Sequence, residues 1–187
     1  MDDNIEVLIE ELNSKNNIIR KNALDTLLEI TEEKVDWIYS EWDHLVDKFN
    51  SYNSFQRNIG VLIMSNLAKS DHKNKFAEII DMYLELMEDE KFITSRQTIQ
   101  NSWKVAVALD SYRRKIVSYL IRMFSNNKHL NTHANLIRKD IVESLIHIYN
   151  YYKDDVDLNL IEIRIKADCE DKERKILESI LKLGVCN

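Results

Sequence analysis

The sequence of 187 residues contains no proline, and its only glycines are Gly60 and Gly184. Proline is confined to helix starts, turns and sheet edges, whereas glycine weakens the interiors of helices and strands. A chain with almost none of either residue predicts long, uninterrupted helices. Because Cys169 and Cys186 are the only cysteines, a disulfide framework is excluded, and we expect a reducing, cytoplasmic location.

Signals for export or membrane insertion are absent as well. The stretch from Met1 to Asn4 is acidic and lacks the basic-then-apolar order of a signal peptide. No apolar run approaches the ~20 residues that span a bilayer. Two glycines cannot build a glycine-rich phosphate loop. We therefore expect no membrane partner and no nucleotide cofactor.

Catalytic and metal-binding clusters are equally scarce. His129 and His133 are four residues apart, but no acidic residue or cysteine lies close by, so exposed turn residues are favoured over a metal pair. Neither cysteine belongs to a CxxC pair, and neither has a histidine nearby in the sequence to activate it. The sequence predicts a protein that is not an enzyme, with no cofactor and no bound metal.

What the sequence does contain is one pattern that occurs five times. Each copy begins with an arginine, and apolar or small residues follow at the third and seventh positions after it. The arginines stand 36 to 42 residues apart, at Arg20, Arg57, Arg96, Arg138 and Arg174. A repeat of about 40 residues is typical of stacked helix pairs. The pattern therefore predicts an all-α architecture.

Each copy is expected to contain two helices joined by a short polar turn, with apolar side chains at the helical period on the buried face. The first helices are predicted over 4–13, 33–49, 73–89, 112–126 and 155–167. The second helices are predicted over 17–31, 54–70, 92–109, 133–152 and 170–183. A residue able to accept a hydrogen bond stands six positions before each arginine, at Ser14, Ser51, Glu90, Thr132 and Asp168.

The stretch from Ile18 to Leu28, within residues 5–30, resembles a HEAT repeat. Its Ile19-Arg20, Ala23 and Leu27 are similar to the Val-Arg-x-x-Ala…Leu core of the family's second helix. The resemblance extends over essentially the whole chain. It implies a single domain over 1–187, a right-handed α-solenoid of about five HEAT-like antiparallel helix pairs with the end repeats as caps.

The resemblance also implies a role for the arginines. In the family, an acidic residue in the turn pairs with the arginine of the second helix, which makes Glu90 and Asp168 the expected acids. Ser14, Ser51 and Thr132 depart from that pattern, so an ionic ladder through all five copies is not expected.

The family further implies that the second helices line a concave face. The positions one, five and eight residues after each arginine point away from the apolar stripe and are assigned to that face. They carry amides, lysines, a few acids and the aliphatic residues Leu28, Leu62 and Ile146, which we expect to be exposed. Solenoids commonly bind partners on such faces.

Charge is distributed unevenly along the chain. Residues 1–90 carry 20 acidic and 9 basic side chains, whereas residues 91–153 carry 3 acidic and 11 basic ones. Basic patches bind acidic groups through charge-assisted hydrogen bonds. We therefore expect a non-catalytic scaffold or adaptor that binds a protein or acidic peptide. The candidate partner-binding residues are Gln97, Asn101, Lys104, Arg113, Arg114, Arg138, Lys139 and Glu143.

Other partners remain open at this point. The acidic N-terminal repeats could bind the basic patch of a second copy of the chain. Nucleic acid is the alternative, and Trp37, Trp42 and Trp103 invite comparison with DNA-alkylation-repeat glycosylases, which use HEAT-like arrays. The comparison fails at Trp103, which occupies a core position with its next acid, Asp110, at the helix end. The pI near 5.4 also lacks a basic footprint.

Overall fold

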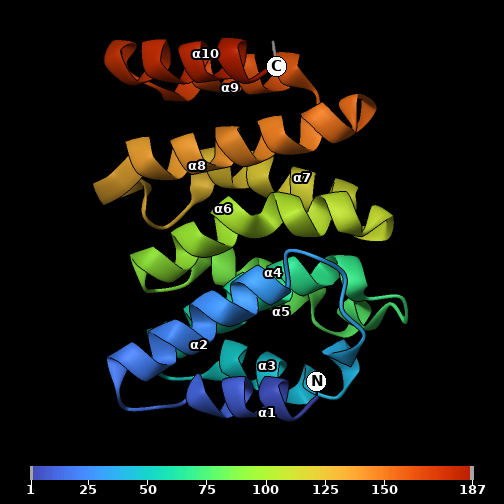
Figure 1. The fold of residues 1–187 in the computed structure, drawn as a ribbon. Helices are drawn as coiled ribbons and strands as arrows, with labels where there is room; N and C mark the ends of the chain where they lie inside the picture. The colour runs from blue at the N-terminus through green and yellow to red at the C-terminus, as the bar shows by residue number, and fades with distance from the viewer. Residues whose placement is uncertain (1, 186–187) are drawn as a thin grey trace. The chain divides into compact units, whose positions relative to one another are not determined.

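The computed structural model describes residues 2–185, and this part of the chain is helical throughout, with no β-strand (Figure 1). Ten α-helices, α1 to α10, are separated by short turns and 3-10 helices. Met1, Cys186 and Asn187 lie outside the described residues. The prediction of an all-α fold in which neighbouring helices pair is confirmed.

The helices belong to two compact units, one extending to Thr98 and the other beginning at Ile99. The boundary lies within α6 (Phe92–Ala108), which therefore contributes its first turns to one unit and its remaining turns to the other. None of the described helices is both long enough and apolar enough to cross a membrane.

In the first unit, α4 is the central helix. It contacts α2, α3 and the 3-10 helix that follows α3, while α1 packs on α2. The helices that lie wholly within this unit are α1 (Asp2–Glu11), α2 (Asn17–Ile30), α3 (Trp42–Val46), α4 (Ser54–Leu67) and α5 (Ile80–Glu85). Large side chains such as Trp42, Phe76 and Tyr83 are buried in its core.

Two turns of the first unit have the same construction. Asn16 Oδ1 accepts a hydrogen bond from Ile18 N at 2.9 Å, and Asn53 Oδ1 accepts one from Phe55 N at 3.0 Å. Asparagine suits this position because its side chain satisfies a backbone N–H that has no partner within the helix. The repeated sequence Ser-x-Asn thus starts the second helix of each of the first two pairs.

The prediction of uninterrupted helices over 33–49 and 73–89 is wrong. The first stretch contains only the short α3 flanked by two 3-10 helices, and the second contains α5 flanked likewise. In the second stretch, Asn74 has a left-handed conformation with φ of 57°, and the Asp71 carboxylate accepts from Lys75 N and Phe76 N. Asparagine and aspartate thus interrupt the helix where glycine and proline are missing.

In the second unit, α8 contacts both α7 and α10, α7 also contacts α9, and α9 packs on α10. These helices are α7 (Asp110–Asn126), α8 (Leu130–Tyr151), α9 (Leu158–Asp168) and α10 (Asp171–Val185). Non-helical dihedral angles at His133 interrupt α8. The long, regular part of α8 therefore follows His133, where the sequence predicted that helix to begin.

Both glycines lie where two helices approach closely. A Cβ atom on Gly60 of α4 would meet Lys48 Cβ and Phe49 Cδ1 at 3.0 Å, and one on Gly184 of α10 would meet Ile146 Cγ2 at 2.7 Å. Neither glycine has a positive φ. They are therefore used for their small size and not for turn formation.

Several side chains bond residues that lie about one repeat away in the sequence. The partners are 32 to 40 residues apart. The pairs are Arg57 with Asp89 and Asn66 with Thr31 in the first unit, and Gln100 with Asp140 and Arg138 with Glu173 in the second. Each unit thus repeats one kind of cross-link between successive helix pairs.

Candidate functional site

The eight residues predicted to bind a partner belong to both units and differ in burial. Gln97 belongs to the first unit, and the other seven belong to the second. Asn101 and Arg113 are buried, while Lys104, Arg138, Lys139 and Glu143 are partly exposed and Arg114 is exposed.

Arg113 is only 5% exposed, which differs from its expected place on an accessible basic patch. Its guanidinium donates to Asp155 Oδ2 at 3.1 Å, to Ala106 O at 3.0 Å and to an oxygen of Asp110. It also lies 3.1 Å from the ring centroid of Tyr152. These contacts join α7 to the last turn of α6 and to the 3-10 helix Lys153–Asp155 that follows α8, so Arg113 cross-links three elements of the second unit.

Arg138 is also engaged within the protein. It donates to Phe124 O at 3.2 Å and to Glu173 Oε2 at 2.9 Å, and its side chain is 12% exposed. The predicted role of the repeat arginines in linking successive pairs is therefore present at this position. Its bonding capacity is directed toward α7 and α10 and not toward solvent.

The acids that pair with the arginines differ from those the HEAT resemblance implied. Arg57 binds Asp89 through two hydrogen bonds, where Glu90 was expected, and Arg138 binds Glu173, where Asp168 was expected. The helix-capping geometry explains the first shift, because Asp89 Oδ1 also accepts from Lys91 N at the start of α6. Sequence offsets locate the turn but not the residue in it that faces the arginine.

In the first two pairs, the residue six positions before the arginine accepts through its backbone carbonyl. Arg20 Nη1 donates to Ser14 O at 2.8 Å, and Arg57 Nη1 donates to Ser51 O at 2.6 Å. The serine hydroxyls instead accept from the Asn16 and Asn53 amides within the turns. Equal offsets in the sequence thus correspond to equal bonds in the first two pairs.

The aliphatic residues assigned to the concave face are less accessible than expected. Leu28 and Leu62 are half-buried, and Ile146 is buried against Gly184. The prediction that these three side chains are exposed is wrong, most clearly at Ile146, which packs against Gly184 of α10.

An aromatic cluster lies on the surface of the second unit. The Trp103 ring stacks on His147, with centroids 4.8 Å apart and planes at 23°, and also lies near Tyr151 at 6.4 Å and 14°. Tyr151 is 62% exposed, and Trp103 is only half-buried despite its predicted core position. We call Trp103, His147 and Tyr151 the aromatic stack.

A stripe of charged residues continues from the aromatic stack along α8. Lys139, Glu143, His147 and Tyr151 follow one another at four-residue intervals, which places them on one side of the helix. Lys139 Nζ and Glu143 Oε1 form an exposed ion pair at 3.6 Å. Two of the predicted residues, Lys139 and Glu143, therefore share one side of α8 with two members of the aromatic stack.

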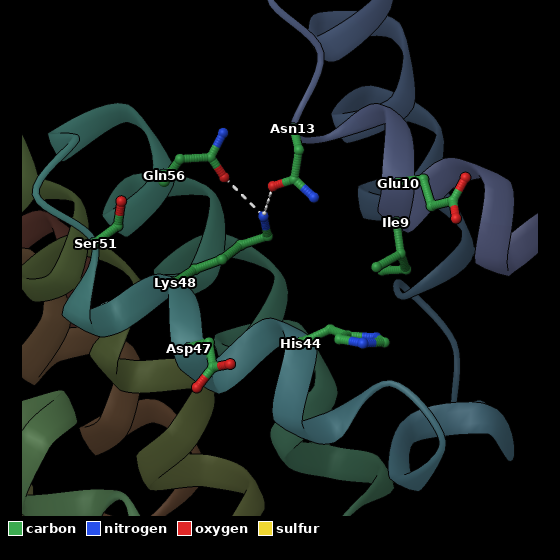
Figure 2. Close-up of a pocket in the computed structure, with 8 residues that line it drawn as sticks. All are labelled: Ile9, Glu10, Asn13, His44, Asp47, Lys48, Ser51 and Gln56. Atoms are coloured by element: carbon green, nitrogen blue, oxygen red, sulfur yellow. Dashed lines mark hydrogen bonds between the residues drawn. The ribbon is translucent and has the colours of Figure 1, made fainter.

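A separate pocket of about 390 Å³ lies in the first unit (Figure 2). The Lys48 side chain ends there between Asn13 and Gln56, although the residue as a whole is only 6% exposed. Its lining also includes Ile9, Glu10, His44, Asp47 and Ser51. Nothing in the repeat pattern predicted this pocket, because Lys48 lies outside the positions that the repeat defines.

No group of three or more histidine, cysteine, aspartate or glutamate side chains in residues 4–185 is arranged to hold a metal ion. His133 Nδ1 lies 2.8 Å from Thr132 Oγ1 at the interruption in α8. Burial raises the pKa of Cys169 to about 11, which keeps this thiol protonated at neutral pH.

No protein-family model matches the chain, and no curated protein matches it. Solved structures do match, among them a crystal structure of an engineered protein from the Northeast Structural Genomics Consortium. That protein is 17% identical, with a TM-score of 0.59 over 97% of this chain and 79% of its own. A likeness at this level of identity concerns the fold alone.

Proposed function

We propose that the protein is a non-catalytic scaffold or adaptor that binds a protein or acidic peptide. In this proposal residues 1–187 are one HEAT-like domain, a right-handed α-solenoid of about five helix pairs. The cross-links between residues 32 to 40 positions apart support such an array, because successive pairs related by translation bring equivalent positions together.

The observation that carries the binding proposal is the aromatic stack. Tyrosine and tryptophan are enriched in protein interfaces because they offer a large, rigid contact area at a low cost in conformational entropy. In the stack, the Trp103 ring contacts His147 and lies nearly parallel to the Tyr151 ring at 6.4 Å, while Tyr151 remains 62% exposed and accessible to a partner. The aromatic stack therefore has the properties of an anchor at a protein interface.

Charge around the stack favours an acidic partner. Lys139 lies on the same side of α8 as the stack, and Lys104 follows Trp103 directly in α6. Rim charges of this kind increase association rates and specificity more than they increase affinity. Arg114, with a side chain 87% exposed, adds positive charge to the same unit, whereas buried Arg113 does not.

The proposal is tested by capture from native cells, identification of the bound protein and measurement of its affinity in purified form. We expect Tyr151→Ala to weaken binding at least tenfold, which is a common loss for an anchor residue. Tyr52→Ala is the matched control, because Tyr52 is a fully exposed tyrosine of the first unit. Equal affinities of the two variants would contradict the proposal, provided that both retain wild-type helicity.

Arg114→Glu tests the charge contribution separately. Substituting Arg113 as well would remove a buried clamp and confuse loss of folding with loss of binding. We expect Arg114→Glu to slow association several-fold at low salt and to leave dissociation unchanged. An unaltered association rate would remove the basic surface from the proposal.

Nucleic acid is the second candidate, and the stacked rings are the observation that favours it. Exposed aromatic rings accept nucleobases in proteins that bind single strands. Phosphate contacts would make binding fall steeply as salt rises, whereas an interface anchored by aromatic residues would change little. Tight, salt-sensitive binding of a labelled single-stranded oligonucleotide would therefore replace the adaptor proposal.

A further inference from the structure

Lys48 is a buried amine whose contacts are all with neutral groups. Its Nζ donates to Asn13 Oδ1 at 2.8 Å and to Gln56 Oε1 at 2.7 Å (Figure 2). Among residues 4–185, it forms no ion pair with a carboxylate. Buried lysines are normally paired with an acid, because an isolated buried charge is costly.

The orientation of Gln56 is fixed from its other side. Gln56 Nε2 donates to Leu12 O at 2.8 Å, so Oε1 is the atom that faces Lys48. A neutral amine has two N–H donors and one lone pair, and the two amide oxygens use both donors. The two acceptors therefore satisfy both donors of the neutral amine, and its lone pair is then the remaining site on Nζ.

We propose that Lys48 is a nucleophilic amine and that the pocket around it binds a small aldehyde, with which Lys48 forms a reversible imine. The lining groups fit such a ligand, because Ile9 provides an apolar wall and Ser51 a hydroxyl group. Glu10 and Asp47 disfavour an anionic ligand, so the aldehyde is neutral or positively charged.

The reaction balances without an oxidant or reductant. The Nζ lone pair attacks the carbonyl carbon, the C–O π bond breaks, and one N–H proton transfers to the oxygen to give a carbinolamine. The hydroxyl group then takes a second proton and leaves as water while nitrogen forms the C=N bond and loses its remaining proton. His44 and Asp47 line the same pocket and are the side chains available for these proton transfers.

Burial also lowers the pKa of Lys48 from 10.5 to about 8. The titratable groups lining the pocket are Glu10 of α1, His44 of α3 and Asp47 of the following 3-10 helix, while α4 contributes the uncharged Gln56. At pH 7 roughly one Lys48 amine in ten is then neutral, compared with about one in several thousand for an exposed lysine. This difference gives Lys48 a reactive form at neutral pH.

The test uses propanal as the probe, with cyanoborohydride to trap the imine, and peptide mass spectrometry to measure the rate at each lysine. Lys21, exposed on α2, and Lys91, exposed before α6, are the reference lysines. We expect Lys48 to react at least tenfold faster than either at pH 7, with a rate that levels off above about pH 8. Equal or slower modification of Lys48 would overturn the proposal.

A near-isosteric variant separates reactivity from simple access. Asn13→Asp places a carboxylate where the amide oxygen accepts from Lys48, which stabilises the ammonium form. We expect the Lys48 rate at pH 7 to fall at least tenfold, with Lys21 and Lys91 unchanged. An unchanged Lys48 rate in this variant, with helicity retained, would likewise contradict the proposal.

Discussion

Lys48 in the first unit and Arg113 in the second are both buried cations, exposed to 6% and 5%, but their surroundings differ. Arg113 contacts two carboxylates, a backbone carbonyl and the ring of Tyr152. Lys48 contacts two amide oxygens. Their pKa values move in opposite directions. Burial lowers the pKa of both residues, but at Arg113 the hydrogen bonds that the guanidinium donates to Asp155 and Asp110, together with the charge of Asp110, outweigh burial and raise it.

The comparison separates two uses of a buried positive charge. Opposite charges stabilise the ionised guanidinium and make Arg113 a fixed cross-link. Amide oxygens satisfy hydrogen bonds without neutralising the charge, so the lysine retains a neutral form that an arginine does not have. Although the two residues are buried to a similar extent, Arg113 thus has a structural role, whereas Lys48 is suited to a chemical reaction.

The largest expected effect comes from removing the two cations in turn. Arg113→Met removes the buried bonds to Ala106 O and Asp155, although Arg114 still binds Asp155, and we expect it to lower the free energy of unfolding by about 3 to 4 kcal/mol. Lys48→Met replaces an uncompensated charge with an apolar chain of similar length, and we expect little loss or a small gain. Urea unfolding followed by circular dichroism measures both, and equal losses would break the comparison.

The arginines of the repeat offer the next test. Arg57 binds the Asp89 carboxylate of the following pair, whereas the contacts of Arg20 are with Ser14 O, Asn17 and the ring of Phe55. We expect Arg57→Leu to cost about 3 kcal/mol and Arg20→Leu about 1 kcal/mol in unfolding free energy. If the two variants melt alike, the buried carboxylate does not strengthen the cross-link.

A smaller effect is expected in the pH dependence of stability. Because the pKa of Lys48 is about 8 in the folded chain and 10.5 when exposed, the unfolded chain binds more protons between these values. The unfolding free energy should therefore rise with pH across this window, by up to about 3 kcal/mol. The destabilisation caused by burying the charged amine is fully present below pH 8. Lys48→Met should lack this rise, and an identical pH profile for the two proteins would contradict the lowered pKa.

The smallest effect is expected at Arg114. Its Nε donates to Asp155 Oδ1 at 3.0 Å, so Arg113 and Arg114 bind the same carboxylate. The hydrogen bond from Arg114 contributes most to the lowered pKa of Asp155. Its own side chain is largely solvent-exposed, so the pair is screened. We expect Arg114→Ala to change the unfolding free energy by less than about 1 kcal/mol in thermal melts. A loss as large as that of Arg113→Met would show that exposure does not distinguish the two arginines.

The second helices of the repeat were predictable from sequence because apolar spacing and the arginines recur there. The predicted ranges 54–70 and 92–109 agree with α4 and α6 within a few residues. The interruptions near Asn74 were not predictable, because a left-handed asparagine is only one of several conformations that the local sequence permits.

The site was less predictable than the fold. Charge counting placed Arg113 and Arg114 in one patch, but only tertiary contact reveals that Asp155, 42 and 41 residues away, buries one of them and leaves the other exposed. The stacking of His147 on Trp103 was not predictable for the same reason, since the two residues belong to different helices. The i, i+4 spacing of Lys139, Glu143, His147 and Tyr151 was present in the sequence and could have identified the stripe.

Hydrogen–deuterium exchange of the full chain, with and without its captured partner, tests the binding account most directly. We expect slower amide exchange on binding in residues 99–108 of α6 and 139–151 of α8, which carry the aromatic stack and its charged stripe. Protection confined to other segments, or exchange unchanged in these two, would contradict the assignment of the binding surface.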